Sequence, residues 1–251
     1  MNSNEDLPKT KNRFLTDAKR VVILITASAV FLLCYSFRFE IASLGFGVAV
    51  CDAFDLLFDK NDYPVELTAV PYQLTSVDKR VVAVSDNNFE VFNSAGKNVF
   101  GGRLNFNNPI AISKGRKLLI YSRGGKNLVV YSGEMPIYTA ETESAMYTAE
   151  IGECGYLAIS MAEFGYQSAV KVYDKNFNEL FLWLSADSII NNISLSADGT
   201  KMAAAGVLFK NDSLTSKITV FDVSEGKELY STEFYNSLVL ETKILPDGNV
   251  M

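Results

Sequence analysis

Glycine-centred turns recur along most of the chain at nearly constant spacing. Gly115, Gly155, Gly199 and Gly248 are separated by 40, 44 and 49 residues. At the clearest of them, Asp198-Gly199 stands between two segments of small and apolar residues, and an Asp-Gly pair supplies the positive φ angles of a tight hairpin. The spacing therefore predicts repeated β-sheet modules.

A second series of short segments keeps the same pace. These segments alternate in the manner of strands, each is followed by a reverse turn, and they lie at residues 89–93, 128–132, 170–174 and 218–222. A unit of forty-odd residues with four short strands is typical of a β-propeller blade. We expect blades at residues 65–104, 109–140, 145–184 and 190–234, and the first strand of a fifth near Leu238.

The expected fold class is all-β: an incomplete β-propeller of about four blades plus one strand of a fifth, preceded by a single transmembrane α-helix. The propeller domain is expected to cover residues 63–251. A propeller must close, because an open fan leaves strand edges and a sheet face unpaired. We therefore expect the domain to be truncated at its C-terminal end, although completion by another chain is an alternative.

The N-terminal part has the pattern of a membrane anchor. Residues 1–20 form a basic tail, and the seventeen residues 21–37 carry no charge, which gives about 25 Å of helix. The positive-inside rule places the tail in the cytoplasm and the rest outside. We predict a single-pass cell-membrane protein, with a transmembrane helix at 21–40 that contacts the lipid bilayer and a membrane-proximal connector at 41–62. A cleaved signal peptide and a buried core helix are the alternatives.

Charge and composition exclude several classes of function. Residues 1–38 carry a net charge of +3 and residues 39–251 a net charge of −9, so a nucleic-acid partner is not expected. The chain has no histidine, which removes the most common general base and metal ligand. Its three cysteines lack metal-ligand spacing; Cys51 and Cys154 are the one pair considered for a disulfide, and two isolated thiols are the favoured alternative.

Several motifs have both a functional and a structural interpretation, and the structural one is favoured in each case. Asp198-Gly199 supplies too few oxygen ligands for a calcium loop, and Gly101-Gly102 lacks the Gly-Lys-Ser/Thr ending of a phosphate loop. The acidic pairs Glu141/Glu143 and Glu150/Glu153 are expected to be solvated surface rather than a glycosidase pair. Trp183 is expected to pack between blades. We assign no catalytic, cofactor-binding or metal-binding residue.

The segment 196–203, followed by 218–222 and 226–229, resembles a repeat of the broad propeller group that includes WD-repeat, TolB-like and quinoprotein-like domains. It lacks the histidine and the Trp-Asp pair of the WD repeat. The whole layout resembles a bacterial family of unknown function, on residues 63–66, 108–109 and 118–121. The resemblance implies a membrane-anchored, propeller-like extracytoplasmic domain, and it brings no catalytic residues.

The loops that join second to third strands, and one blade to the next, are expected to share one face. They carry aromatic and amide side chains suited to recognition, because rings contribute contact area and amides direct hydrogen bonds. The candidate residues are Phe106, Asn108, Phe164, Tyr166, Phe209 and Tyr235. We therefore expect a binding or scaffolding module for an envelope protein or glycan. The alternatives are a quinoprotein-like or hydrolytic enzyme with its site in missing blades, and a sensor that acts through a cytoplasmic partner.

Overall fold

The computed structural model describes residues 26, 28, 64–210, 212–245 and 247–251. The chain divides into two compact units, Met1–Cys51 and Asp52–Met251. Thr26 and Ser28 are helical, and the rest of the predicted tail, span and connector lies outside the described residues. Within the part of the chain that is described, no helix is long and apolar enough to cross a bilayer.

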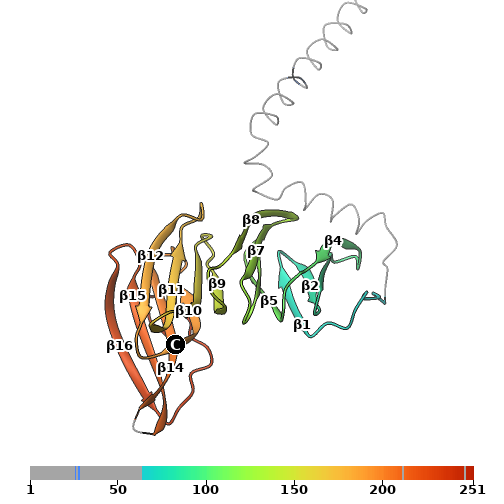
Figure 1. Cartoon of the computed structure of the whole chain (residues 1–251). Coiled ribbons are helices and arrows are strands. Elements are labelled where there is room, and N and C mark those ends of the chain that lie inside the picture. The colour runs from blue at the N-terminus through green and yellow to red at the C-terminus, as the bar shows by residue number, and fades with distance from the viewer. Residues whose placement is uncertain (1–25, 27, 29–63, 211, 246) are drawn as a thin grey trace, which may run out of the picture. The chain divides into compact units, whose positions relative to one another are not determined.

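Four antiparallel sheets follow one another along the second unit, each with four strands paired in sequence order (Figure 1). We call them blades 1 to 4. Blade 1 comprises β1 (Gln73–Val77), β2 (Arg80–Val84), β3 (Asn88–Phe92) and β4 (Asn98–Arg103). Blade 2 comprises β5 (Pro109–Lys114), β6 (Lys117–Ser122), β7 (Asn127–Ser132) and β8 (Met135–Glu141). Blade 3 comprises β9 (Met146–Ile151), β10 (Leu157–Glu163), β11 (Tyr166–Tyr173) and β12 (Glu179–Ser185). Blade 4 comprises β13 (Ile189–Leu195), β14 (Lys201–Lys210), β15 (Ser213–Asp222) and β16 (Lys227–Tyr235). The prediction of four consecutive four-stranded sheets is confirmed.

The turn glycines lie where the first strand of a blade meets the second. Gly115, Gly155 and Gly199 have φ angles of 57°, 91° and 75°, in the left-handed region that favours glycine. A Cβ at position 199 would lie 2.7 Å from the Tyr156 ring, so this turn also needs glycine for space.

The fourth strand of every blade contains a β-bulge, and the bulge always lies opposite the same two positions of the third strand. These positions hold a valine followed by an aromatic residue: Val91/Phe92, Val130/Tyr131, Val172/Tyr173 and Val220/Phe221. The unpaired residue on the outer strand is in every blade aliphatic: Val99, Ile137, Leu180 and Leu229. Because a bulge interrupts the regular ladder and increases the local twist, it makes an exposed edge strand a poor template for pairing with another chain.

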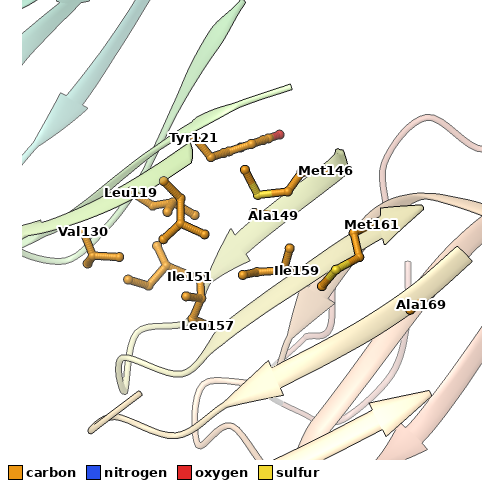
Figure 2. Packing of buried hydrophobic residues seen from close by; sticks show 11 residues of the cluster. Leu119, Tyr121, Val130, Met146, Ala149, Ile151, Leu157, Ile159, Met161 and Ala169 are labelled. Carbon is orange, nitrogen blue, oxygen red and sulfur yellow. The ribbon is translucent and has the colours of Figure 1, made fainter. Parts of the chain in front are cut away.

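The blades pack against one another through three apolar clusters. Figure 2 shows Leu119, Tyr121 and Val130 of blade 2 beside Met146, Ile151 and Ile159 of blade 3, all of them buried. A second cluster joins blades 1 and 2, and a third joins blades 3 and 4. In blades 2 and 3, alternate residues of the second strand, such as Leu118 and Leu119 of β6, therefore pack toward the blade on either side, as expected for a strand buried on both faces.

An aromatic residue near the end of the third strand contacts the preceding blade in blades 2 and 4. The ring of Tyr131 lies 5.3 Å from that of Phe89 in blade 1, and the ring of Phe221 lies 4.7 Å from that of Trp183 in blade 3. These separations are typical of favourable aromatic pairs. The prediction that Trp183 packs between blades is confirmed.

The segment after β16 forms a hairpin in place of the strand that we expected near Leu238. A single bridge joins Ile244 to Val250 around the Asp247-Gly248 turn. The hairpin attaches to β13 through side chains, because the N–H of Thr242 donates to Asn192 Oδ1 at 2.8 Å and the N–H of Ile244 donates to Ser194 Oγ at 3.0 Å. These side-chain acceptors replace a backbone ladder, so no regular strand is present among these residues.

Candidate functional site

The loops between second and third strands contact the connections between blades. The N–H of Leu104, in the β4–β5 connection, donates to the carbonyl of Asn87 in the β2–β3 loop at 2.7 Å. In blade 4, Ser216 Oγ of β15 donates to the carbonyl of Ser237, in the segment after β16, at 2.9 Å. Both kinds of loop therefore lie at the same ends of the strands. We call this side the loop face, and the side with the glycine turns the turn face.

Phe164 and Tyr166 lie at the β10–β11 turn of blade 3. The Phe164 ring is 98% exposed and Tyr166 is 44% exposed. The backbone N–H of Phe164 donates a hydrogen bond to the carboxylate of its neighbour Glu163, at 3.1 Å. Burial of so large an exposed ring against a partner would contribute substantial free energy, which makes Phe164 the most accessible aromatic anchor among the candidate residues.

Phe209 and Tyr235 lie at the end of blade 4, whose strands β14 and β15 are ten residues long. Phe209 is 81% exposed. Glu233 Oε2 accepts hydrogen bonds from Lys210 Nζ at 2.7 Å and from the Tyr235 hydroxyl at 2.8 Å. The hydrogen bond to Glu233 raises the pKa of Lys210, and the bonds from Lys210 and Tyr235 lower the pKa of Glu233. The network holds Tyr235 in place at the same end of blade 4 as the exposed Phe209.

Phe106 and Asn108 belong to the β4–β5 connection. Phe106 is half-buried and packs against the cluster between blades 1 and 2. Asn108 is exposed, has a φ of 51°, and accepts a hydrogen bond from the N–H of Arg123 at its carbonyl. Phe106 therefore exposes less of its ring to a partner than Phe164 or Phe209 does. Asn108 is exposed to solvent and accessible to a partner.

A polar network fixes the connection between blades 3 and 4. Asp187 accepts hydrogen bonds from Lys217 Nζ at 2.9 Å and from Ser188 Oγ at 3.1 Å, and the hydroxyls of Ser185 and Ser188 lie 2.9 Å apart. Partial burial raises the pKa of Asp187, but the bonds and the charge from Lys217 and the serine bonds outweigh it and lower the pKa overall. Lys217 pairs with the carboxylate, so the network links β15 to the connection between blades 3 and 4.

The first strands β1, β5, β9 and β13 line a common space, which we call the central channel. It contains an ion pair that the sequence did not indicate. Lys114 Nζ of β5 lies 3.6 Å from Glu150 Oε1 of β9, and the Glu150 side chain is 18% exposed. Burial raises the pKa of Glu150 to about 7, against the attraction of Lys114 and with added repulsion from Glu241. The expectation that Glu150 is solvated surface is therefore wrong, because packing of the inner strands removes it from most of the water; Glu153 is exposed as expected.

The Asp-Gly turns use their carboxylates within the turn. Asp198 Oδ1 accepts hydrogen bonds from Ser196 Oγ at 2.6 Å and from the N–H of Thr200 at 3.0 Å, and these bonds lower the pKa of Asp198. Asp247 Oδ1 accepts from the N–H of Asn249 at 3.0 Å. No group of three or more potential metal-ligating side chains occurs among the residues that the structure describes. Cys154 is a free thiol, and Cys51 lies outside the described residues.

Four consecutive antiparallel blades, packed face to face with their first strands innermost, define a β-propeller-like protein. The chain belongs to the family of unknown function DUF5711, whose model matches residues 61–251. No curated protein matches the chain.

Solved structures with the same fold are distant in sequence. Kluyveromyces lactis Hsv2 with loop 6CD replaced by a Gly-Ser linker has a TM-score of 0.53 and 15% identity, over 72% of this chain and 60% of that one. A second structure of Kluyveromyces lactis Hsv2 has a TM-score of 0.51 and 12% identity, over 71% of this chain and 61% of that one. The WD40 domain of Neurospora crassa Pan2 has a TM-score of 0.48 and 14% identity, over 68% and 54%. The chain spans less than two thirds of each of these proteins. At 15% and 12% identity, the likeness to the two Hsv2 structures shows the fold alone.

Proposed function

We propose that this protein is a membrane-anchored binding or scaffolding module whose loop face holds an envelope partner, a protein or a glycan, outside the cytoplasmic membrane. The anchor is the uncharged segment 21–37 with its basic flank. The blades are the binding part. The function is recognition rather than chemistry.

The exposure of aromatic rings on the loop face carries this proposal. Phe164 and Phe209 are almost wholly in water, and Tyr235 is 58% exposed. Each of these residues lies on or beside a hydrogen-bonded hairpin, so little conformational entropy is lost when the ring meets a partner. Rigid aromatic side chains with a polar neighbour, here Lys210 and Glu233, are typical of interface anchors.

Affinity capture with the full chain tests the loop face. The triple variant Phe164→Ala/Phe209→Ala/Tyr235→Ala is expected to lose the envelope component that the wild type retains. The matched control is Met135→Ala/Leu182→Ala/Tyr230→Ala, which removes three exposed apolar side chains from the outer strands instead. Equal retention by both variants would contradict the proposal.

Protease accessibility tests the placement. With an epitope tag after Met251, protease added to intact spheroplasts is expected to remove the tag while a cytoplasmic marker stays whole. A tag that is cleaved only after lysis would place the blades in the cytoplasm and exclude an envelope partner.

A further inference from the structure

The innermost strands of all four blades enclose a polar cavity. Its volume is about 420 Å³, and a second cavity of about 250 Å³ shares Lys114, Glu150, Ser194 and Lys243 with it. The walls come from β1, β5, β9, β13 and the segment that precedes the last hairpin, so the site is built from residues far apart in the chain. Neither cavity contains the candidate aromatic residues of the loop face.

Hydrogen-bond donors without an acceptor line this cavity. Asn192 Oδ1 already accepts from the N–H of Thr242 at 2.8 Å and from its hydroxyl at 2.7 Å, which leaves the Asn192 amide NH₂ to donate. Ser194 Oγ accepts from the N–H of Ile244, which leaves its own O–H. Among the described residues, neither donor has an acceptor. Thr75 on β1 adds another hydroxyl to the wall.

The charged groups of the cavity come from several elements. Lys114 of β5 faces Glu150 of β9 at 3.6 Å, Glu241 and Lys243 come from the segment after β16, and Glu153 lines the second cavity. The residues of β1 and β13 that line the two cavities are uncharged. Glu150 is the most shielded of the acids, and a proton on it would release Lys114 from its ion pair and add one more donor to the cavity.

We propose that the channel binds a small organic carboxylate, with Lys114 as the ionic partner of the ligand and Asn192 and Ser194 as neutral donors to it. A carboxylate accepts several hydrogen bonds from such donors, and a charge-assisted bond to an ammonium is stronger than a neutral one. The ligand takes the place that Glu150 occupies as the partner of Lys114. The site is separate from the loop face and does not depend on the function proposed for it.

Binding of the ligand should be coupled to protonation of Glu150. The ionised carboxylate of Glu150 competes with the ligand for Lys114, so the ligand favours the protonated form. Because Glu150 titrates at about 7, the protonated fraction and the apparent affinity fall about tenfold between pH 6 and pH 8.

Calorimetric titration of the full chain in a non-ionic detergent, with succinate as the probe, tests the site. Succinate is expected to bind at pH 6 and about tenfold more weakly at pH 8. Glu150→Gln, which mimics the protonated acid, should restore the pH 6 affinity at pH 8. Lys114→Gln should remove binding at both values, and the control Lys175→Gln, in the β11–β12 turn, should change neither. Circular dichroism verifies that each variant is folded.

Three results would overturn the proposal. The first is no binding of succinate by the wild type at millimolar concentration. The second is equal binding by folded Lys114→Gln. The third is tighter binding of ethylammonium than of succinate, which would make the channel a cation site. Loss of partner capture by the loop-face variant leaves succinate binding unchanged, so the two proposals fail separately.

Discussion

Two turn glycines lie at equivalent places in their blades. Substituting each of them separates the free-energy cost of a left-handed backbone from the cost of a steric clash. Gly115 and Gly199 both have a positive φ, of 57° and 75°. A Cβ at position 115 would have no atom within 4 Å, whereas a Cβ at position 199 would lie 2.7 Å from two atoms of the Tyr156 ring. Tyr156 packs against the cluster between blades 3 and 4, so the ring cannot move away freely.

Gly115→Ala should therefore lower the free energy of unfolding by about 1 kcal/mol, through the strain of the left-handed backbone alone. Gly199→Ala should add the steric clash with Tyr156 to this strain and lower the free energy of unfolding by about 2–4 kcal/mol in total. At about 2–4 °C per kcal/mol, the melting temperature should fall by about 3 °C for the first variant and by about 10 °C for the second. Circular dichroism of the full chain measures the free energies by urea denaturation and the melting temperatures by thermal denaturation.

The Tyr156→Ala background completes the test. In that background the ring is absent, so Gly199→Ala should destabilise the protein no more than Gly115→Ala does. The destabilisation by Gly199→Ala in the wild type minus that in the Tyr156→Ala background is the coupling energy between positions 156 and 199. Equal destabilisation by the two glycine variants in the wild-type background would refute the close approach between this turn and the ring of Tyr156.

Three further variants examine polar groups of the blades. The Tyr121 hydroxyl is buried between blades 2 and 3 and has no hydrogen-bond partner among the described residues, so Tyr121→Phe should leave the free energy of unfolding unchanged or raise it by up to about 1 kcal/mol; a clear loss of stability would mean that the hydroxyl is hydrogen-bonded. Asp187→Ala should destabilise by about 1–2 kcal/mol, because it removes the acceptor of Lys217 and of two serines; urea denaturation that shows no change would contradict the structural role of this network. Because the folded-state pKa of Glu150 is raised from 4.5 to about 7, its contribution to stability is full below pH 4.5 and falls as the pH rises through 7. Glu150→Gln should therefore be more stable than the wild type at pH 8 and not at pH 4, and thermal denaturation at the two values that shows the opposite order would exclude this burial.

The blade pattern could be predicted from the sequence because its signals are local. Asp198-Gly199 specifies a turn because Gly199 adopts a positive φ of 75° and the Asp198 carboxylate accepts hydrogen bonds within the turn. Gly199 alone of the pair has the positive φ angle that we expected of both residues. The strand 218–222 alternates within five residues. Four such units in succession then determine the order of the sheets, since consecutive antiparallel strands tend to pair with their neighbours.

The details of the site could not be predicted because they depend on contacts between distant residues. Lys114 and Glu150 lie 36 residues apart, and only the packing of the inner strands brings them to 3.6 Å. Phe106 and Phe164 both follow turn-like sequences, yet one packs on a blade and the other is in water. The bulge residue Leu180 likewise reflects the register between β11 and β12, which no single strand encodes.

Site-specific photo-crosslinking in intact cells tests the central claim most directly, namely that the loop face holds a partner. A photoreactive phenylalanine analogue is placed at Phe164 on the loop face or, in a matched variant, at the exposed Asn176 in the β11–β12 turn on the opposite side. We predict a discrete crosslinked envelope species from position 164 and none from position 176. The same species from both positions, or from position 176 alone, would contradict the account.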